Sequence, residues 1–484
     1  MSYLSYRFKF LYTLLTFTLM LVPVAHAKMA VQLAGNPTVN LTASTSQIIL
    51  PLTQRDACQV ATLEAQPHKQ QSVLQLHAMT STTTPIMAGG TYSKRNLKGY
   101  HFELNPSGRL QLFVKHGVPQ TAKVKCAGNN LIVEVVERYK QVESSETLAR
   151  GLKYVRYNAV PKAGMTFRTH NLEWTPRGSN VKLTPLMPDP NSLRGLRTVK
   201  STLSLYDGIA GVNASFFNAN LKIPLGLVLK DGELLNGSLF NRVALGLDAQ
   251  NKASIAQVEL TGLIKMGRWT QSIEIVNMPR SDGNQVALYS QMWGSQSPPA
   301  GGGNVAIRLR NGRLHEVSSA GTLAIEGSND WVLYGSRANL ELLTTAELGT
   351  SVEVLLSTVP DWSDKTMIVA GGPTLLQGGE PYIDLEAQRF GALPPNQKRP
   401  RTAIGVHPNE MITLMVVDAS PQGATLRETA ELLQLFGASE GMNLDGGAST
   451  QMVVKGRVPF ATLQGGAAVS TVLGFVPTLP WPSI

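Results

Sequence analysis

Short apolar runs separated by turn residues fill most of this sequence, and this alternation limits what the chain can fold into. From about Gly151 onward, the runs have the length of single strands and end at Gly, Asn, Asp or Pro. The clearest long helical period begins at Leu426, where Leu426, Ala430 and Leu433 lie on one stripe. The sequence therefore predicts a strand-rich α+β domain with mixed sheets over residues 150–484.

The helical stretch carries its own start signal. Thr425 and Glu428 have the spacing of a capping box, and Gly437 follows the last periodic residue. We expect a capped helix of about three turns. Glu428 is then favoured as a helix cap over the alternative of a catalytic acid.

Residues 28–140 have a different pattern, without a helical period of any length. Arg109–Val114 and Leu131–Val136 alternate between apolar and polar residues, as half-buried strands do. This region is expected to be a small all-β domain of unknown role that precedes the larger domain. The polar segment 141–147 is expected to be a linker or a short connecting element.

Residues 1–27 have the three parts of a secretory signal peptide. Arg7 and Lys9 precede an apolar stretch from Phe10 to Val24, and small residues surround a cleavage point after Ala27. The apolar stretch is shorter than the roughly 20 residues that span a bilayer. We expect cleavage after Ala27, no membrane span in the mature chain, and a periplasmic or secreted protein.

Cysteine content and charge are compatible with export. Cys58 and Cys126 are the only cysteines, and one disulfide between them is favoured over two buried free thiols. The formal net charge is +10, and removal of two basic residues with the signal leaves 10 − 2 = +8. This charge suits phosphate-bearing or acidic polysaccharides, whereas no basic cluster with interleaved aromatic residues indicates nucleic-acid binding.

Polar residues gather where predicted strands end. The segment Asn443-Leu-Asp-Gly-Gly-Ala-Ser-Thr450 sets one carboxylate among amides and hydroxyls on glycine-rich backbone. It lies between the predicted helix and a strand expected at Gln451–Val454. Free backbone N–H groups on such a tight connection can face an anion.

Five segments in this order make residues 150–480 resemble the phosphodiester glycosidase family. They are Val212–Phe217, Pro224–Gly226 with Asp231-Gly232, Ala370–Leu376, Arg401–Gly405 and Gly423–Thr450. The resemblance implies hydrolysis of a sugar-1-phosphodiester between the anomeric carbon and the phosphate oxygen. The chain departs from the family pattern at Ala214 and Ala448, where glycine is usual, and an added methyl group there would narrow a close backbone approach.

This reaction asks for a carboxylate that faces the sugar and a cation that binds the phosphate. We expect Asp445 to be the first carboxylate, as nucleophile or as base for water, and Asp418 the second. Arg401 is the expected phosphate clamp, because its guanidinium binds two oxygens at once. The alternative for each of the two aspartates is that it is only a turn residue. The alternative for Arg401 is that it forms a structural ion pair.

The remaining site residues are assigned to substrate binding. Backbone N–H groups near two glycine pairs are expected to complete an anion site, and polar side chains are expected to contact the sugar or fix Asp445. These residues are Gly371, Gly372, Gly446 and Gly447 for the backbone, and Asn213, Thr402, Asn443, Ser449 and Thr450 for the side chains.

Two functional classes follow from these observations. The favoured one is an exported hydrolase that cleaves sugar-1-phosphodiesters in envelope or extracellular glycans. The alternative is a non-catalytic glycan-binding or exopolysaccharide-assembly protein that uses the same pocket. The scattered histidines form no zinc pattern, and no nucleotide-binding fingerprint occurs, so we expect no cofactor.

Overall fold

The fold is taken from a computed structural model of the chain. It describes residues 34–35, 37–41, 45–53, 61–66, 71–80, 97–104, 106, 109–115, 121–136, 138–162, 165–391, 393–418 and 423–478. The predicted signal peptide and Cys58 lie outside these residues. Within them the strands form eight sheets, beside three α-helices. The strand-rich prediction is confirmed, although the balance is closer to all-β than to α+β.

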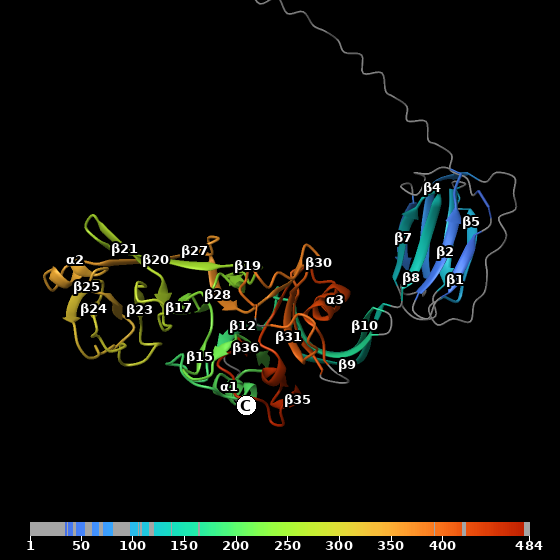
Figure 1. Cartoon of the computed structure of the whole chain (residues 1–484). Helices are drawn as coiled ribbons and strands as arrows, with labels where there is room; N and C mark the ends of the chain where they lie inside the picture. The colour runs from blue at the N-terminus through green and yellow to red at the C-terminus, as the bar shows by residue number, and fades with distance from the viewer. Residues whose placement is uncertain are drawn as a thin grey trace, which may run out of the picture.

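Two four-stranded antiparallel sheets use the strands from residues 38–136. The first has the order β1 (Thr38–Leu41), β2 (Thr45–Pro51), β8 (Asn130–Val136), β7 (Thr121–Ala127), and the second β3 (Ala61–Gln66), β4 (Gln71–Thr80), β6 (Arg109–Lys115), β5 (Gly99–Leu104). These strands gather at one end of Figure 1. The strands expected at Arg109–Val114 and Leu131–Val136 are thus confirmed as β6 and β8. Cys126, on β7, is disulfide-bonded.

The segment expected to be a linker is instead a strand. β9 (Tyr139–Ala149) is the edge of an eight-stranded sheet and pairs antiparallel with β10 (Leu152–Lys162). Most of its side chains are exposed, so its sequence lacks the apolar alternation that identifies a half-buried strand. Its backbone pairing with β10, more than burial of its own side chains, holds it in place.

The eight-stranded sheet is the frame on which the candidate site is built. Its order is β30 (Glu380–Pro381), β29 (Thr374–Gln377), β33 (Glu440–Asn443), β31 (Arg401–Val406), β32 (Ile412–Val417), β11 (Met165–Trp174), β10, β9. Helix α3 (Leu426–Phe436) covers one face, where Ala430 and Leu433 pack against Ala403 and Met415. Figure 1 shows α3 beside β31.

The predicted helix and its capping box are confirmed. The Thr425 hydroxyl accepts a hydrogen bond from the Glu428 N–H at 3.1 Å, and the Glu428 carboxylate accepts one from the Thr425 N–H at 2.7 Å. Gly437 ends the helix in the left-handed conformation, with φ 92°. A glycine adopts this φ without the steric cost that a side chain would add.

Two five-stranded sheets cover the other face of the large sheet. One has the order β12 (Val181–Leu186), β36 (Val472–Pro477), β13 (Ala210–Asn213), β34 (Gln451–Val454), β35 (Arg457–Ala461), with α1 (Val199–Leu205) beside it. The other has the order β17 (Glu233–Asn236), β16 (Val228–Lys230), β28 (Lys365–Ala370), β18 (Val243–Asp248), β19 (Ala253–Gln257). Leu414, Phe475 and Leu245, one from each of the three sheets, share a single core.

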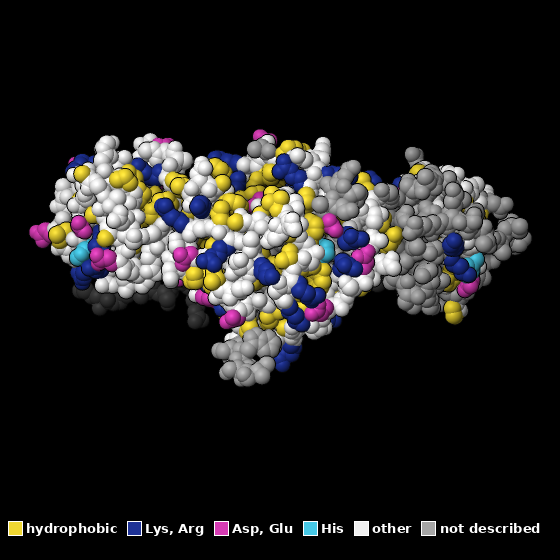
Figure 2. All heavy atoms as spheres, turned by 90° about the horizontal axis from the view of Figure 1, so that it is seen from below, with side chains coloured by type: hydrophobic (Ala, Val, Ile, Leu, Met, Phe, Trp, Pro, Cys, Tyr) yellow, Lys and Arg dark blue, Asp and Glu magenta, His cyan; other side chains and the backbone are white. Residues whose placement is uncertain are grey.

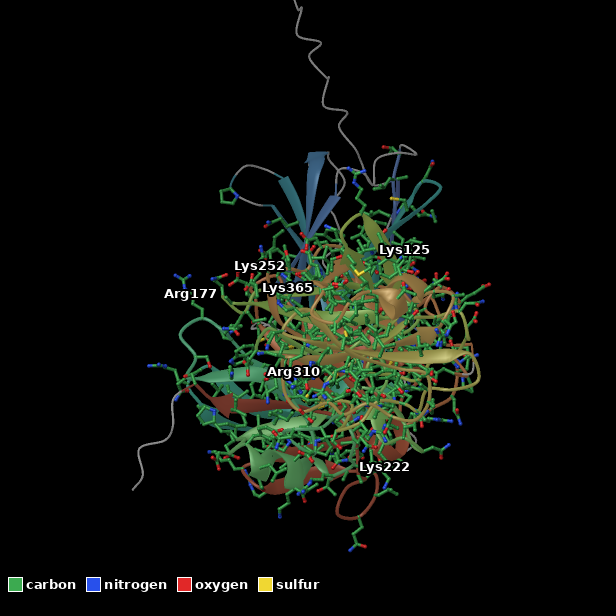
Figure 3. The ribbon with its side chains drawn as sticks, turned by 90° about the vertical axis from the view of Figure 1, so that its left-hand side faces the viewer. Lys125, Arg177, Lys222, Lys252, Arg310 and Lys365 are labelled. Atoms are coloured by element: carbon green, nitrogen blue, oxygen red, sulfur yellow. The ribbon has the colours of Figure 1, made fainter. Side chains whose placement is uncertain are left out.

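Residues 259–359 supply the strands at the other end of Figure 1. They are β20 (Glu259–Met266), β21 (Trp269–Ile273), β22 (Ile275–Val276), β23 (Ala287–Tyr289), β24 (Asn304–Arg310), β25 (Arg313–Ser318), β26 (Asp330–Ser336) and β27 (Glu353–Val359), with α2 (Glu341–Thr345). A short hairpin of β14 (Phe217–Asn218) and β15 (Ile223–Pro224) precedes them. Arg310, labelled in Figure 3, and Arg308 bind Asp330 and hold the pKa of its carboxyl well below the usual range.

Charged side chains are dispersed over the described part of one face of the molecule. Figure 2 shows Lys and Arg spread over one face, with Asp and Glu between them, so this face has no continuous basic patch. Among the residues that the structure describes, no helix has the length and apolar character to cross a membrane.

Candidate active site

Asp445 lies where the ends of three strands meet. The Leu444 N–H donates to the carbonyl of Thr402 at 2.8 Å, and the Asp445 N–H donates to the carbonyl of Ala214 at 2.9 Å. β33, β31 and β13 therefore converge on this residue. The sequence predicted a direct helix-to-strand connection, but β33 lies between α3 and Asp445, and a 3-10 turn at Gly447–Ser449 leads on to β34. The strand predicted at Gln451–Val454 is confirmed as β34.

The Asp445 carboxyl is buried enough to change its acidity. Burial raises its pKa to about 6, while hydrogen bonds from the Ser449 hydroxyl and the Gly446 N–H act in the opposite direction. The Gly446 N–H lies 2.9 Å from Oδ1 of Asp445. Near neutral pH the group is mostly ionised and can accept a proton, which suits a general base or a nucleophile.

The glycine pairs do not provide free N–H groups for an anion, which corrects the sequence prediction. The N–H groups of Gly446 and Gly447 donate to Asp445 Oδ1 and to the carbonyl of Pro400. Those of Gly371 and Gly372 donate to the carbonyls of Val243 and Asn443. All four donors are therefore used within the protein, and an anion bound here needs side-chain donors.

Close packing explains why glycine occupies these positions. A Cβ atom on Gly371 would lie 2.7 Å from the Asn443 carbonyl oxygen, and one on Gly446 would lie 3.2 Å from the Pro400 carbonyl oxygen. Gly372 and Gly447 have φ values of 118° and 63°. A side chain at any of the four would strain the connection that holds Asp445.

Asn213 and Thr402 form the buried support of Asp445. Asn213 Nδ2 donates to the Asp445 carbonyl at 2.6 Å, and its Oδ1 accepts from the Thr402 hydroxyl at 2.8 Å and from the Gln451 N–H at 3.1 Å. Both side chains are fully buried. The structure thus favours the alternative of a strand-end role for Asn213 over contact with a sugar.

Two other predicted side chains lie in the same support. Asn443 Nδ2 donates to the carbonyl of Gly372 at 3.0 Å and also to that of Leu444. Its Oδ1 and the hydroxyl of Thr450 are buried and have no hydrogen-bond partner among the described residues. Both atoms are enclosed by protein, so neither is exposed to a substrate beside Asp445.

Arg401 and Asp418 leave the large sheet on opposite faces. Arg401 pairs with Val417 in the β31–β32 ladder, so the next residue, Asp418, points the other way. Arg168 lies 3.8 Å from the Asp418 carboxylate. From the sequence we expected these two residues to belong to one site. Because side chains alternate between the two faces of the sheet along β32, Asp418 instead points away from Arg401.

Arg401 lies beside Gly446, and its guanidinium is already bonded within the protein. Its Nε donates to the carbonyl of Ala424 at 2.9 Å and its Nη2 to the carbonyl of Gln397 at 2.7 Å. Burial, and secondarily the charge of Arg399, lowers its pKa to about 10, so it stays charged at neutral pH. A Cβ atom on Gly446 would lie 3.9 Å from Arg401 Cδ, so the cation lies next to the Asp445 loop.

Sequence reasoning missed two further arginines. Arg399 is exposed, and its Cδ would lie 3.8 Å from a Cβ atom on Gly447. Arg242 is half-buried against aromatic rings, 4.1 Å from the Phe390 centroid, and burial lowers its pKa. A Cβ atom on Gly372 would contact the Phe390 ring.

A repeated pattern in the sequence points to Arg242. Arg242-Val-Ala-Leu-Gly246 and Arg401-Thr-Ala-Ile-Gly405 have the same order of residue types, and in both the arginine stands at the start of a strand. No comparable signal marks Arg399. None of the three arginines forms an ion pair with a carboxylate in the part of the chain that the structure describes, although the charge of Glu428 acts on Arg401 from a longer distance.

The two departures from the family pattern differ in burial. Ala214 is fully buried in the core below the site, and Ala448 is exposed. Over the described residues, no cluster of three or more His, Cys, Asp or Glu side chains is arranged to hold a metal ion.

Comparison with known proteins supports the resemblance. Residues 303–476 match the model of the phosphodiester glycosidase family, and this range contains Arg399, Arg401 and Asp445. The family supports glycoside hydrolysis in general as the type of activity. No curated protein matches the chain.

Two solved structures share its fold, and a third has a lower similarity. A hypothetical protein from Synechocystis has a TM-score of 0.64 at 19% identity, over 92% of this chain and 80% of that one. A putative exported protein from Burkholderia pseudomallei has a TM-score of 0.56 at 17% identity, over 92% and 99%. The catalytic domain of zebrafish N-acetylglucosamine-1-phosphodiester alpha-N-acetylglucosaminidase, auto-inhibited by its pro-peptide, gives 0.39 at 14% identity, over 70% and 88%.

Proposed function

We propose that this protein is an exported glycosidase that hydrolyses a sugar-1-phosphodiester at the bond between the anomeric carbon and the phosphate oxygen. One observation carries the proposal. A partly buried carboxylate, Asp445, lies on a connection that runs beside Arg399 and Arg401, and neither arginine forms an ion pair with a carboxylate among the described residues. This pattern combines the carboxylate that a sugar cation needs with the positive charge that a phosphate needs.

The arginines have different parts in binding the phosphate. Arg399 is exposed and lies beside Gly447, which supports our assignment of direct phosphate contact to it. Arg242 is held against the ring of Phe390, and its buried Nε has no described hydrogen-bond partner. Arg401 acts at longer range, because two of its nitrogens donate to backbone carbonyls.

Asp445 supplies the charge and the base. In its ionised form it faces the anomeric carbon and takes a proton from the attacking water. The carbon–oxygen bond to phosphate breaks with its electron pair on the phosphate, and the water oxygen bonds to the anomeric carbon. The products are a free sugar and a phosphate monoester.

A phosphate leaving group removes the need for a second catalytic carboxylate. Glycosidases usually pair a base with an acid that protonates a departing alkoxide. A phosphate monoester has a second pKa of about 6 and leaves as a stable dianion without that proton. The position of Asp418 on the other face of the sheet is therefore compatible with catalysis at Asp445.

Export and an anionic glycan substrate belong to the same proposal. The signal pattern of residues 1–27 supports export, as does the fold shared with a protein described as exported. A mature net charge of +8, from 10 − 2, suits acidic envelope or extracellular glycans.

The test compares the mature chain with one carboxylate variant. Residues 28–484 would be incubated with a panel of sugar-1-phosphodiesters, and reducing sugar would be measured. Asp445→Asn should lower kcat by about 100-fold or more, because the amide cannot take the proton. Asp364→Asn, at an exposed aspartate that pairs with Lys365, is the matched control and should retain full activity.

Two results would contradict the proposal. Equal activity of Asp445→Asn and the unaltered chain would remove Asp445 from the mechanism. Tight binding of the panel without turnover would assign the protein to the glycan-binding class instead.

A further inference from the structure

An exposed aromatic ring with two arginines lies close to the candidate active site. Phe240, in the segment between β17 and β18, is 47% exposed. The guanidinium carbon of Arg389 lies 5.2 Å from the centroid of this ring, and that of Arg242 lies 5.6 Å from it. We call these three residues the Phe240 platform.

The platform borders the strand ends that hold Asp445. The guanidinium carbon of Arg242 is also 4.1 Å from the centroid of Phe390, and the rings of Phe390 and Phe216 are 5.5 Å apart. Phe216 lies two residues after Ala214, whose carbonyl accepts a hydrogen bond from the Asp445 N–H at 2.9 Å. The platform therefore adjoins the connection that carries the proposed chemistry.

The platform has positive charge without a carboxylate that pairs with it. Neither Arg242 nor Arg389 forms an ion pair within the described ranges. Burial lowers the pKa of Arg242, and no neighbouring charge opposes this effect. Asp384 and Glu386 precede Arg389 in the same segment, but Asp384 instead accepts a hydrogen bond from the Ala387 N–H at 2.9 Å. Because Arg389 is exposed, its N–H groups can bind an anionic group of a ligand.

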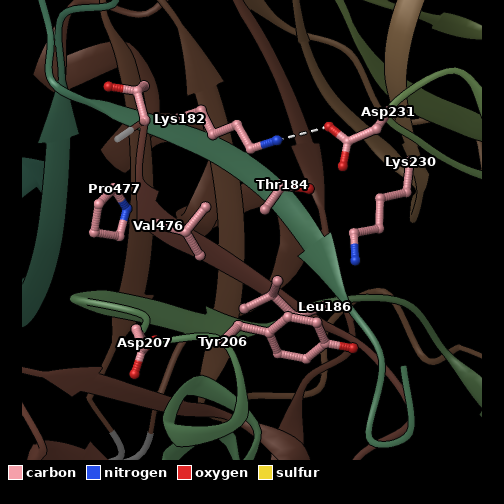
Figure 4. A pocket seen from close by; sticks show the side chains of 10 residues that line it. Lys182, Thr184, Leu186, Tyr206, Asp207, Lys230, Asp231, Val476 and Pro477 are labelled. Carbon is pink, nitrogen blue, oxygen red and sulfur yellow. Dashed lines mark hydrogen bonds and ion pairs between the residues drawn. The ribbon is translucent and has the colours of Figure 1, made fainter. Parts of the chain in front are cut away.

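Charge pairing separates this platform from the cavity between β12, β36 and β16. Figure 4 shows that Lys182 and Lys230 line that cavity together with Asp207 and Asp231. Lys182 and Asp231 form an ion pair at 2.7 Å. The lysines there share their space with an equal number of carboxylates, so that cavity has no charge preference for an anion, whereas the Phe240 platform has one.

The backbone at Phe240 has an unusual conformation. The φ angle is 55° at Phe240 and 50° at Asn241, both in the left-handed region. This conformation is rare for a bulky side chain, and such strain occurs preferentially at ligand sites. Since the ring stays half exposed, burial in the core does not explain why a phenylalanine occupies this position.

We propose that Phe240 and Arg389 bind the alcohol component of the phosphodiester, on the far side of the phosphate from the cleaved bond, and that this component is an acidic sugar. Its carboxylate binds Arg389, and the apolar face of its ring lies on Phe240. Arg242, which contacts both Phe240 and Phe390, keeps its role at the phosphate between the two sugar units. This inference rests on the proposed function, because it names one half of that substrate.

Titration calorimetry on residues 28–484 measures this subsite without turnover. The probes are methyl glucoside 3-phosphate and methyl glucuronide 3-phosphate, which differ only in the carboxylate and have no sugar-1-phosphate bond to hydrolyse. We expect the glucuronide phosphate to bind at least about tenfold more tightly, since its carboxylate adds a charge-assisted bond. Equal binding of the two probes would overturn the inference.

Two variants test the assigned contacts. Arg389→Gln should weaken binding of the glucuronide phosphate by about tenfold and leave the glucoside phosphate unchanged, because only the first probe has a carboxylate. Phe240→Ala should weaken both probes by about fivefold, whereas Phe240→Tyr keeps the ring and should bind both normally. Arg177→Gln, at an exposed arginine in the turn after β11 that Figure 3 labels, is the control for net charge and should also bind normally. Unchanged binding in both Arg389→Gln and Phe240→Ala would overturn the inference, as would an equal loss in Arg177→Gln.

A kinetic comparison tests whether the subsite serves the reaction. For a diester of a sugar-1-phosphate with a hexuronic acid, Arg389→Gln should raise KM by about tenfold and leave kcat unchanged, since it removes binding that substrate and transition state share. The corresponding methyl diester should show no change. A normal KM with the hexuronic acid diester would contradict the subsite even if hydrolysis occurs. Probe binding as expected without hydrolysis of any diester would reject the proposed function and retain the acidic-sugar subsite.

Discussion

Asp445 is both the proposed chemical centre and a partly buried charge that the fold has to hold. Its carboxylate accepts bonds from Gly446 and Ser449, yet burial still raises its pKa to about 6. Holding this carboxylate ionised near neutral pH therefore lowers the stability of the folded protein, while its pKa suits proton transfer at that pH. Asn213 and the carbonyl of Ala214 fix the backbone on which this carboxylate stands.

The raised pKa makes a prediction about pH. Activity should fall by about tenfold per pH unit below pH 6, as Asp445 becomes protonated. The folded state also binds this proton more tightly than the unfolded chain, so the contribution of Asp445 to stability decreases as pH rises from about 4 to 6. Asp445→Asn should therefore gain about 1–3 kcal/mol in unfolding free energy, relative to the unaltered chain, between pH 4 and pH 7.

Rate profiles and urea unfolding at several pH values check this prediction. The asparagine side chain does not titrate, so its stability should lack this pH dependence. Two results would mean that the carboxyl titrates as an exposed aspartate. One is activity that falls only near pH 4, and the other is a difference in unfolding free energy between Asp445→Asn and the unaltered chain that does not change with pH.

The surroundings of a single residue were predictable where they depend on its neighbours in the sequence. Asp445 stood out as a candidate because a carboxylate on glycine-rich backbone between regular elements is unusual in a core. The buried positions of Asn213 and Thr402 were not predictable, because these two residues bond to each other although they lie 189 residues apart along the chain. Arg242 was missed although its pentapeptide resembles that of Arg401, and only the folded chain brings it to Gly372.

At the scale of elements, α3 was readable from the sequence because its caps are local. The bonds that start it join residues three positions apart, and Gly437 ends it through its own backbone preference. β33 and β9 were missed for the opposite reason. β33 has four residues, and β9 is mostly exposed, so both depend on pairing with distant or neighbouring strands.

The capping box gives a prediction about Glu428. Thr425→Ala should lower the unfolding free energy by about 1 kcal/mol, because the first turn loses its side-chain acceptor. Glu428→Gln keeps an oxygen that accepts from the Thr425 N–H, so kcat should stay close to that of the unaltered chain. Thermal unfolding and the reducing-sugar assay measure the two effects.

Thr425→Ser is the matched control, since serine keeps the accepting oxygen. A Glu428→Gln variant that folds normally but loses turnover would show that Glu428 takes part in the chemistry. An unaffected Tm in Thr425→Ala would show that tertiary packing alone positions α3.

At the scale of the whole molecule, the site exists because three sheets share one core. β13, β31 and β33 come from two of these sheets and end at Asp445, while β18 and β28 of the third bring Arg242 and Gly372. The segments are spread over more than 200 residues of sequence. A strand-rich fold of this kind places chemistry at converging strand ends, which composition and local period do not specify.

The most direct test of the account asks which bond breaks. Hydrolysis of an active sugar-1-phosphodiester would be run in water labelled with heavy oxygen, and the phosphate product would be analysed by mass spectrometry. Attack of water on the anomeric carbon predicts a phosphate monoester without the label, with the new oxygen on the sugar. A labelled phosphate would mean attack at phosphorus, and it would contradict the assignment of Asp445 to a glycosidase site.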